Sequence, residues 1–441
     1  MKVSGWGRYP VLEATVHAPR SEHALREMIK STPNLIARGN GRSYGDSAIN
    51  RSATIQLRHF NRMIAFDSKT GQLVAESGVL LADIITAFLP RGWFPIVTPG
   101  TKFVTLGGMI AADVHGKNHH KDGSFEKCVD WIEIVDANGE VIRCSRHENV
   151  ALWEWTIGGM GLTGVILRAA IRLRSVETGW IKQTTIPAQN LVAAMSVFEK
   201  SQDATYSVAW IDCLGTGEQL GRSLVMLGEH VKNANLGQKQ ANAPFDTNTE
   251  RKLSIPLDFP SWSLNRFSIR AFNALYYWNG LRKPSEQIVD WDSYFYPLDA
   301  ILGWNRIYGR KGFAQFQCVI PLEQSRAGLT ELLEAISKAG AGSFLAVLKK
   351  FGKQESLFSF PMDGYTLALD FPINKTTLQL MEHLDGIAIS HGGRFYLAKD
   401  SRMTAQTLRA SDNRSADFAT MREDSDLRNA FQSAQSERLD I

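Results

Sequence analysis

Cysteine is scarce in this chain of 441 residues: Cys128, Cys144, Cys213 and Cys318 lie far apart, and none forms a CxxC pair. This spacing argues against a zinc ribbon or a disulfide framework and favours a reducing compartment. Long apolar runs are also missing. The first ten residues lack the apolar core of a signal peptide, and no stretch is long enough to span a bilayer. We therefore expect a protein that is cytoplasmic or bound peripherally at the inner membrane.

Excess charge is small as well. A net charge of +4 gives no reason to expect nucleic acid, but it permits weak attraction to an anionic substrate or membrane surface. There is no Walker loop, and no GxGxxG stretch is followed by the acidic residue of dinucleotide-binding folds. His115, His119 and His120 have no cysteine or carboxylate to complete a tetrahedral set, so no metal is expected. The length predicts two domains.

Three glycine-rich stretches dominate the first half of the chain, at residues 39–46, 98–108 and 157–164. In the second, Gly107 and Gly108 leave backbone N–H groups that an anion can approach closely. Residues 109–114 are small and apolar enough to lie against a flat ring, and the polar run 115–119 follows. This combination predicts a large cofactor with a pyrophosphate and a reactive ring. A buried glycine turn with surface histidines is the alternative, and the loop at 39–46, where Ser43 could start a helix, disfavours it.

Residue periodicity predicts an α+β arrangement in which the two halves of the chain differ. The first half alternates short elements, with strands at 34–38, 54–57, 63–66, 72–76, 129–135, 140–143 and 165–173 and helices at 80–89 and 149–155. The second half predicts an antiparallel sheet backed by helices, with strands at 180–186, 206–213, 223–228, 313–321, 343–351, 366–372 and 394–401 and helices at 190–200, 327–339 and 377–389.

Two segments of the second half leave alternatives open. Residues 231–262 lack periodicity and are expected to form a mobile loop. The aromatic stretch 266–281 predicts a lid helix or a lipid-facing surface, although plain core is the more frequent outcome. Gln315 and Gln317 share one face of a strand, where they would either line a polar site or face outward from an edge, and the residues favour neither.

Six motifs together resemble the vanillyl-alcohol-oxidase-type flavoproteins, and the similarity extends over nearly the whole chain. They are Ala37–Asp46, Pro99–Thr101, Thr105–Gly108, Asp113–His120, Gly159–Gly164 and Tyr396–Arg402. The resemblance implies an FAD-binding domain of two α+β subdomains and a substrate domain built on an antiparallel sheet. We expect the FAD-binding domain at residues 1–175 and the substrate domain, with a mobile 231–300 segment, at 176–395. Residues 396–441 would return to the FAD-binding domain.

The resemblance also implies which residues hold FAD. They are Ala37, Arg38, Gly39, Asn40, Gly41, Arg42, Ser43, Tyr44, Gly45, Asp46, Ser47, Gly100, Thr105, Leu106, Gly107, Gly108, Ala112, Asp113, Val114, His115, Val165 and Tyr396. Many relatives attach FAD through a histidine where this chain has Arg42. Because arginine cannot form that bond, we expect noncovalent FAD.

The implied reaction is oxidation of the 2'-hydroxyl of a polyprenyl-phosphate ribose to a keto sugar. A separate short-chain reductase would then complete epimerisation to arabinose, a precursor of cell-wall arabinan. Loss of hydride from an alcohol is easier when a nearby group takes or polarises the hydroxyl proton. The match favours Lys399 for this role, as a base of lowered pKa or as a fixed cation, over a surface lysine. His115 is the second catalytic candidate.

The substrate would contact Lys117, Gln315, Gln317, Lys349 and Ala368. Close relatives have a cysteine where Ala368 stands, and hydride transfer does not need a thiol there. Two other functions remain open. One is an aldonolactone or free-sugar oxidase with the same fold, and the other is a flavoprotein subunit without turnover.

Overall fold

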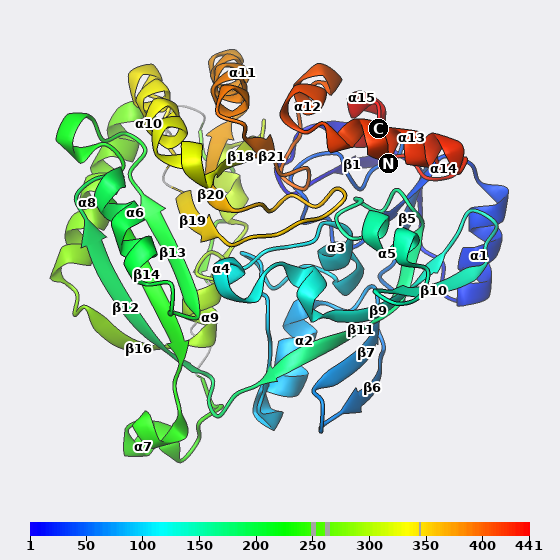
Figure 1. The fold of residues 1–441 in the computed structure, drawn as a ribbon, viewed down its shortest axis with the longest axis horizontal. Coiled ribbons are helices and arrows are strands. Elements are labelled where there is room, and N and C mark those ends of the chain that lie inside the picture. Colours follow the sequence, from blue (N-terminus) through cyan, green and yellow to red (C-terminus); the bar gives the residue numbers. More distant parts are fainter. Residues whose placement is uncertain (248–252, 261–264, 344) are drawn as a thin grey trace.

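Three sheets carry most of the strands in the computed structural model, which describes residues 1–247, 253–260, 265–343 and 345–441 (Figure 1). The α+β fold class is confirmed, with two smaller sheets from the first half of the chain and one eight-stranded sheet from the second. In the described ranges, no helix combines the length and apolarity needed to cross a membrane.

The smallest of the three sheets is parallel, in the order β3-β5-β4. Its strands are β3 (Val16–His17), β4 (Leu35–Arg38) and β5 (Ala53–Gln56). Helix α1 (Glu22–Ser31) connects β3 to β4 and buries Leu25 and Ile29, four residues apart on one face. Ser21 caps this helix by accepting a hydrogen bond from the backbone N–H of Ala24. The first glycine loop begins directly after the last residue of β4.

The second sheet is antiparallel, in the order β10-β9-β11-β7-β6, and β8 pairs with the far end of β11. Its strands are β6 (Met63–Asp67), β7 (Gln72–Glu76), β8 (Trp93–Pro95), β9 (Val129–Val135), β10 (Val141–Ser145) and β11 (Val165–Ser175). The helices of this region are α2 (Leu81–Phe88), α3 (Leu106–Ala111), α4 (His119–Asp122) and α5 (Val150–Thr156). The second glycine loop leads into α3 and the third leads into β11, so both end at elements of one packed core.

The eight-stranded sheet is antiparallel throughout, in the order β16-β12-β14-β13-β19-β20-β18-β21. Its strands are β12 (Trp180–Ala188), β13 (Tyr206–Ile211), β14 (Ser223–His230), β16 (Glu286–Asp290), β18 (Phe313–Pro321), β19 (Ala346–Phe351), β20 (Gly364–Pro372) and β21 (Arg394–Phe395). Helices α6 (Leu191–Lys200), α10 (Leu322–Ala339) and α11 (Lys375–Ser390) pack on the sheet and share a core with it. In β18 the alternating side chains therefore divide between that core and the opposite face.

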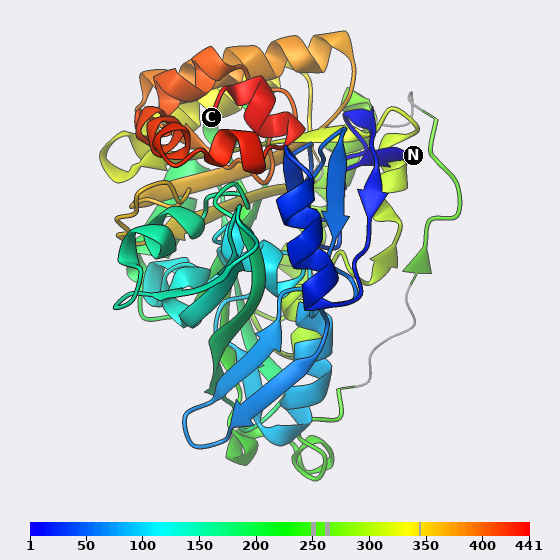
Figure 2. The same cartoon turned by 90° about the vertical axis from the view of Figure 1, so that its right-hand side faces the viewer.

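The remaining elements connect or cover these sheets. They are β1 (Lys2–Ser4), β2 (Val11–Glu13), α7 (Gln238–Ala241), β15 (Leu253–Ser254), α8 (Arg266–Arg282), α9 (Trp291–Phe295), β17 (Ile301–Leu302), α12 (Ala405–Ser411), α13 (Arg414–Asp424), α14 (Leu427–Ala430) and α15 (Ala434–Leu439). The C-terminal helices lie over the N-terminal half of the chain (Figure 2). Arg438 of α15 forms ion pairs with Asp46 of the first glycine loop and with Asp400.

The structure corrects two local predictions. The expected strand 394–401 ends at Phe395, and residues 397–399 form a turn in which the N–H of Lys399 donates to the carbonyl of Tyr396 at 2.9 Å. No helix begins at Ser43. The first glycine loop consists of turns and bends at this point. The expected mobile loop at 231–262 contains α7 and β15 where it is described, and residues 248–252 and 261–262 lie outside the described part. The two boundaries between the three expected segments remain predictions.

Candidate active site

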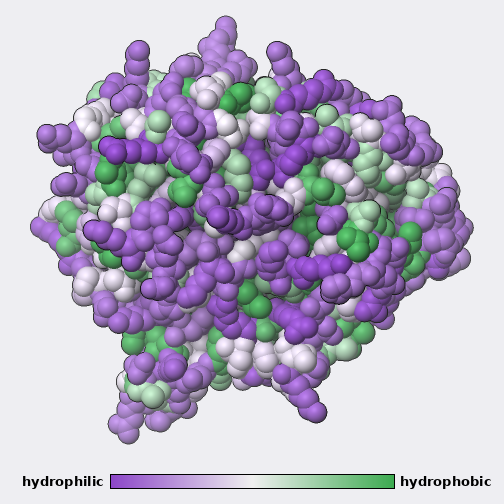
Figure 3. Space-filling view, in the orientation of Figure 1, coloured by the Kyte–Doolittle hydropathy of each residue, from purple (hydrophilic) through white to green (hydrophobic). Residues whose placement is uncertain are grey.

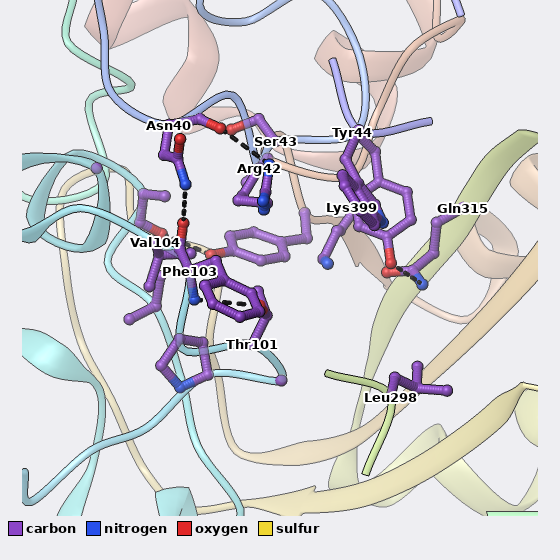
Figure 4. Close-up of a pocket in the computed structure, with 18 of the residues that line it drawn as sticks. Asn40, Arg42, Ser43, Tyr44, Thr101, Phe103, Val104, Leu298, Gln315 and Lys399 are labelled. Atoms are coloured by element: carbon purple, nitrogen blue, oxygen red, sulfur yellow. Dashed lines mark hydrogen bonds between the residues drawn. The ribbon is translucent and has the colours of Figure 1, made fainter. Parts of the chain in front are cut away.

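One cavity of about 880 Å³ lies between the three glycine loops and the face of the eight-stranded sheet that α6, α10 and α11 leave open. Its volume is within the range of small-molecule and cofactor sites, roughly 300–1,000 Å³. The loops contribute bare glycine backbone and the side chains of Asn40, Arg42 and Tyr44, whereas β13, β18, β19 and β20 contribute polar, apolar and aromatic side chains. Figure 4 shows part of this wall, with Asn40 and Phe103 toward one end and Tyr44, Lys399 and Gln315 together at the other.

The first glycine loop is held tightly against the second. The side-chain amide of Asn40 donates to the carbonyl of Phe103 at 2.8 Å. A Cβ at Gly39 would lie 2.2 Å from the hydroxyl oxygen of Thr105, and Gly41 has a φ of +61°. Both positions therefore require glycine. The guanidinium of Arg42 lies over the ring of Trp6, 4.5 Å from its centre.

His115 lies in the cavity wall as a neutral imidazole. Burial and the nearby charge of Lys349 lower its pKa well below the usual value. The side-chain amide nitrogen of Gln317 is 3.1 Å from His115 Nε2 and can only donate, so Nε2 accepts and the ring proton is on Nδ1. Thr366 fixes Gln317 by accepting a second bond from the same amide. His115 Nδ1 is buried with no hydrogen-bond partner among the described residues. Within the described part of the chain, this nitrogen is therefore a buried donor without a partner in the wall of the cavity.

Lys399 and Tyr44 form the centre of a second polar group. The Lys399 amine lies 3.9 Å from the centre of the Tyr44 ring. Gln315 donates to the Tyr44 hydroxyl at 3.3 Å and to Asp370 at 2.6 Å. Burial and the charge of Lys349 hold the pKa of Lys399 below that of a free lysine, while Asp370 opposes this effect. Burial raises the pKa of Asp370. A buried amine that readily loses its proton is suited to accept one from an alcohol.

Two further lysines, both partly buried, line the cavity. Lys117 donates to the carbonyl of Tyr294, and its amine lies 4.2 Å from the centre of that residue's ring. Burial, then repulsion from Lys349, lowers the pKa of Lys117 to about 7. Burial alone lowers the pKa of Lys349 to about 8. Among the described residues no hydrogen-bond or ion-pair partner of the Lys349 amine is found. An anion in the cavity would compensate these charges.

Most of the residues selected from the sequence line this one cavity. Those that do are Ala37, Gly39, Asn40, Gly41, Arg42, Ser43, Tyr44, Ser47, Gly100, Thr105, Gly107, Gly108, Ala112, Val114, His115, Lys117, Gln315, Gln317, Lys349, Ala368, Tyr396 and Lys399. The two glutamines are buried and point inward, so the outward-edge alternative for them is wrong.

The other selected residues lie behind the cavity wall: Arg38, Gly45, Asp46, Leu106, Asp113 and Val165. Arg38 donates to the carbonyls of Ala48 and Ser4, which shapes the loop from outside. Asp113 accepts from the backbone N–H of Glu126 and from Gln354. Leu106 and Val165 are fully buried core residues. These residues support the loops without lining the cavity.

Sequence reasoning missed Asp370 and Trp210. Asp370 is directly opposite Gln315 in the ladder between β18 and β20, just as Ala368 is opposite Gln317. The period of two along β20 was therefore sufficient to find it. Trp210 of β13 lines the cavity, whereas the sequence pattern indicates only that it belongs to an apolar strand. No signal in its neighbourhood marks it, because an aromatic residue in such a strand is most often core.

Comparison with known proteins gives a consistent family assignment. The FAD binding domain family matches residues 14–145. Decaprenylphosphoryl-beta-D-ribose oxidase of Mycolicibacterium smegmatis is 34% identical over 100% of this chain and 97% of that protein. The chain belongs to the family of this oxidase. Two other relatives are more distant: an uncharacterised protein of Streptomyces coelicolor, 29% identical over 82% of this chain and 99% of its own length, and bovine L-gulonolactone oxidase, 26% identical over 43% of each.

Members of the decaprenylphosphoryl-beta-D-ribose oxidase family are FAD-linked, and this chain is an FAD-dependent oxidoreductase. The residues present fit the cofactor. A Cβ at Gly100 would meet nothing within 4 Å, so the bare backbone there borders open cavity. Gly39 lets the first loop approach Thr105 of the second. Gly107 lets the second loop pack on Ser77, so bare backbone borders the cavity as a cradle requires. The unpartnered donor at His115 Nδ1 lies in the same wall.

Proposed function

We propose that this oxidoreductase oxidises a secondary alcohol of a lipid-linked pentose phosphate, specifically the 2'-hydroxyl of a polyprenylphosphoryl ribose. The observation that carries the proposal is the cluster of the partly buried Lys117, Lys349 and Lys399, in one cavity with the amides of Gln315 and Gln317. Such a set suits a ligand with both hydroxyl groups and an anionic group. The related oxidase of M. smegmatis is named for a ribose substrate of this class.

FAD, when bound, supplies the acceptor for the hydride that leaves the alcohol carbon. Noncovalent binding would rest on the glycine loops, whose backbone approaches the cofactor closely. Lys399 would accept the hydroxyl proton as the carbonyl forms, since burial favours its neutral amine. Asp370, reached through Gln315 and Tyr44, would keep Lys399 in place.

His115 and Gln317 would orient the sugar. Because Gln317 fixes the ring of His115, the imidazole would keep one orientation beside the sugar. Lys349 and Lys117 would bind the phosphate. Ala368 leaves open space in the wall formed by β20, where a bulkier side chain would narrow the sugar pocket.

The ketone product implies a second step elsewhere. A separate short-chain reductase would reduce the 2'-keto sugar from the opposite side and so complete epimerisation to the arabinose derivative. A substrate with a polyprenyl tail would also bring the enzyme to the surface of the inner membrane.

The test is anaerobic reduction of the purified, FAD-loaded enzyme, followed by the loss of flavin absorbance. We expect polyprenyl-phosphate ribose to bleach the flavin rapidly and free ribose or an aldonolactone to bleach it slowly. Faster bleaching by the free sugars would show a soluble-sugar oxidase instead. No bleaching by any of these alcohols, with FAD bound, would indicate a subunit without turnover.

A further inference from the structure

Helix α8 exposes an unusual number of large apolar side chains. Only Ile269 and Asn273 of its 17 residues are buried. Phe267 is 82% exposed, Leu275 55% and Trp278 45%, and Leu281 is also exposed. By contrast, the face of the molecule seen in Figure 3 is mostly hydrophilic, with its hydrophobic residues scattered. Large exposed apolar groups that gather on one element mark an interaction surface.

This helix is firmly attached, so its exposure is not the result of a loose fit. Asn273 donates to Asp212 at 2.7 Å inside the protein. The ring of Tyr276 packs on Trp210 with 4.7 Å between ring centres. Gly280 lies so close to Leu224 that a Cβ there would be 2.3 Å from it. The outer face is therefore presented in a fixed orientation.

The charges of this helix have one sign. Residues 265–283 contain Arg266, Arg270, Arg282 and Lys283 and no acidic residue. The guanidinium of Arg282 lies 3.1 Å from the centre of the Trp278 ring. The nearby carboxylate of Glu286 is already paired with Lys182. A helix with arginines and aromatic residues on its exposed surface has the composition of helices that lie in the interface of an anionic bilayer.

The same helix borders the cavity. Tyr276 and Trp210, which hold α8 to the sheet, both line the cavity, and so does the half-exposed Leu302 of β17. A ligand tail that passed between Tyr276 and Leu302 would leave the cavity next to α8. In Figure 1 this helix lies at the left edge, away from both chain termini. The membrane-facing side would therefore be the outer edge of the substrate domain.

We propose that α8 lies in the interface of an anionic lipid bilayer, with Phe267, Trp278 and Leu281 among the acyl chains and its arginines at the lipid phosphates. This inference rests on the proposed function, since it gives the lipid tail of the substrate a direct way from the membrane into the cavity. It identifies the partner as a lipid surface and not as a protein.

Sedimentation of the FAD-loaded full chain with vesicles tests the proposal. We compare vesicles of phosphatidylcholine alone with vesicles of phosphatidylcholine and phosphatidylglycerol at equal lipid concentration. We expect binding to the anionic vesicles that weakens as salt is added. Phe267→Ser with Trp278→Ser should reduce that binding roughly tenfold or more. Arg266→Gln and Arg270→Gln should each reduce it roughly fivefold.

A matched control is Val192→Ser, which removes from α6 an apolar side chain that is 48% exposed, close to the 45% of Trp278, and should leave vesicle binding unchanged. The proposal is overturned if the parent protein stays in the supernatant with both vesicles, or if the double serine variant binds as well as the parent. It is also overturned if α8 mediates a dimer that Phe267→Ser abolishes.

Bleaching of the flavin by a water-soluble, short-chain prenyl-phosphate ribose is measured in parallel. Bleaching without vesicle binding removes the membrane inference alone, whereas vesicle binding without bleaching removes the proposed substrate.

Discussion

Replacing Lys349 with methionine should make the protein more stable and its substrate binding weaker. Burial lowers the pKa of the Lys349 amine from 10.5 to about 8. Because one pKa unit corresponds to about 1.4 kcal/mol, the buried charge lowers the free energy of unfolding by up to about 3 kcal/mol. Methionine keeps a similar length without the charge, so Lys349→Met should recover about 1–3 kcal/mol at pH 7.

The sign of the pH dependence follows from the same pKa values. Below about pH 8 the amine is charged in the folded and the unfolded chain, so the full destabilisation applies. Between about pH 8 and 10.5 the unfolded chain binds the proton and the folded one does not, so the free energy of unfolding rises with pH. The advantage of Lys349→Met should therefore be largest at pH 7 and shrink toward pH 10.

The assay is denaturant unfolding followed by tryptophan fluorescence, with FAD in saturating excess and no substrate. Lys350→Met is the matched control, because the Lys350 amine is paired with Glu199, so its loss should destabilise the protein. A Lys349→Met protein that is no more stable than the parent at pH 7, or whose gain does not change with pH, would refute the reasoning. With a polyprenyl-phosphate ligand added, the parent should be stabilised more than the variant.

Three further outcomes are expected. Lys399→Met should slow anaerobic flavin bleaching by roughly 10²–10⁴-fold, the usual contribution of a general base, while the flavin absorbance of the purified protein persists; an unchanged rate would remove Lys399 from the chemistry. Gly39→Ala should abolish FAD retention, because its Cβ would lie 2.2 Å from a threonine hydroxyl of the second loop. The control is Gly386→Ala in α11, whose Cβ would meet no atom within 4 Å, so this variant should retain FAD. Equal flavin content in the two purified variants would contradict the cradle. Ala368→Cys should keep the oxidase active and add a cavity thiol whose alkylation, detected by mass spectrometry, is blocked by substrate.

The regular elements with strong periodicity could be predicted from the sequence, whereas the local structure at Lys399 could not. Leu397 and Ala398 are apolar and resemble the continuation of a strand. The carbonyl of Ala398, however, accepts from the backbone N–H of Tyr44 in the first glycine loop. That contact joins residues more than three hundred positions apart, and no local pattern encodes it. The sequence located helix α8, but an aromatic stretch of this kind is most often part of a core. The exposure of α8 could not be predicted because it depends on which other elements pack against the helix.

The placement of the buried lysines bears on which substrate fits the cavity. Uncompensated buried amines reduce stability, so a fold that keeps Lys117 and Lys349 inside its cavity needs an anion that offsets them. A cofactor pyrophosphate would lie at the glycine loops, where bare backbone and Arg42 face it. The two lysines instead come from the polar segment after α3 and from β19 of the eight-stranded sheet. A second anion on the substrate side explains them, and a neutral lactone or free pentose would leave the Lys349 amine unpaired, whereas Lys117 would keep its bond to the Tyr294 carbonyl. The cavity therefore favours a sugar that carries a phosphate.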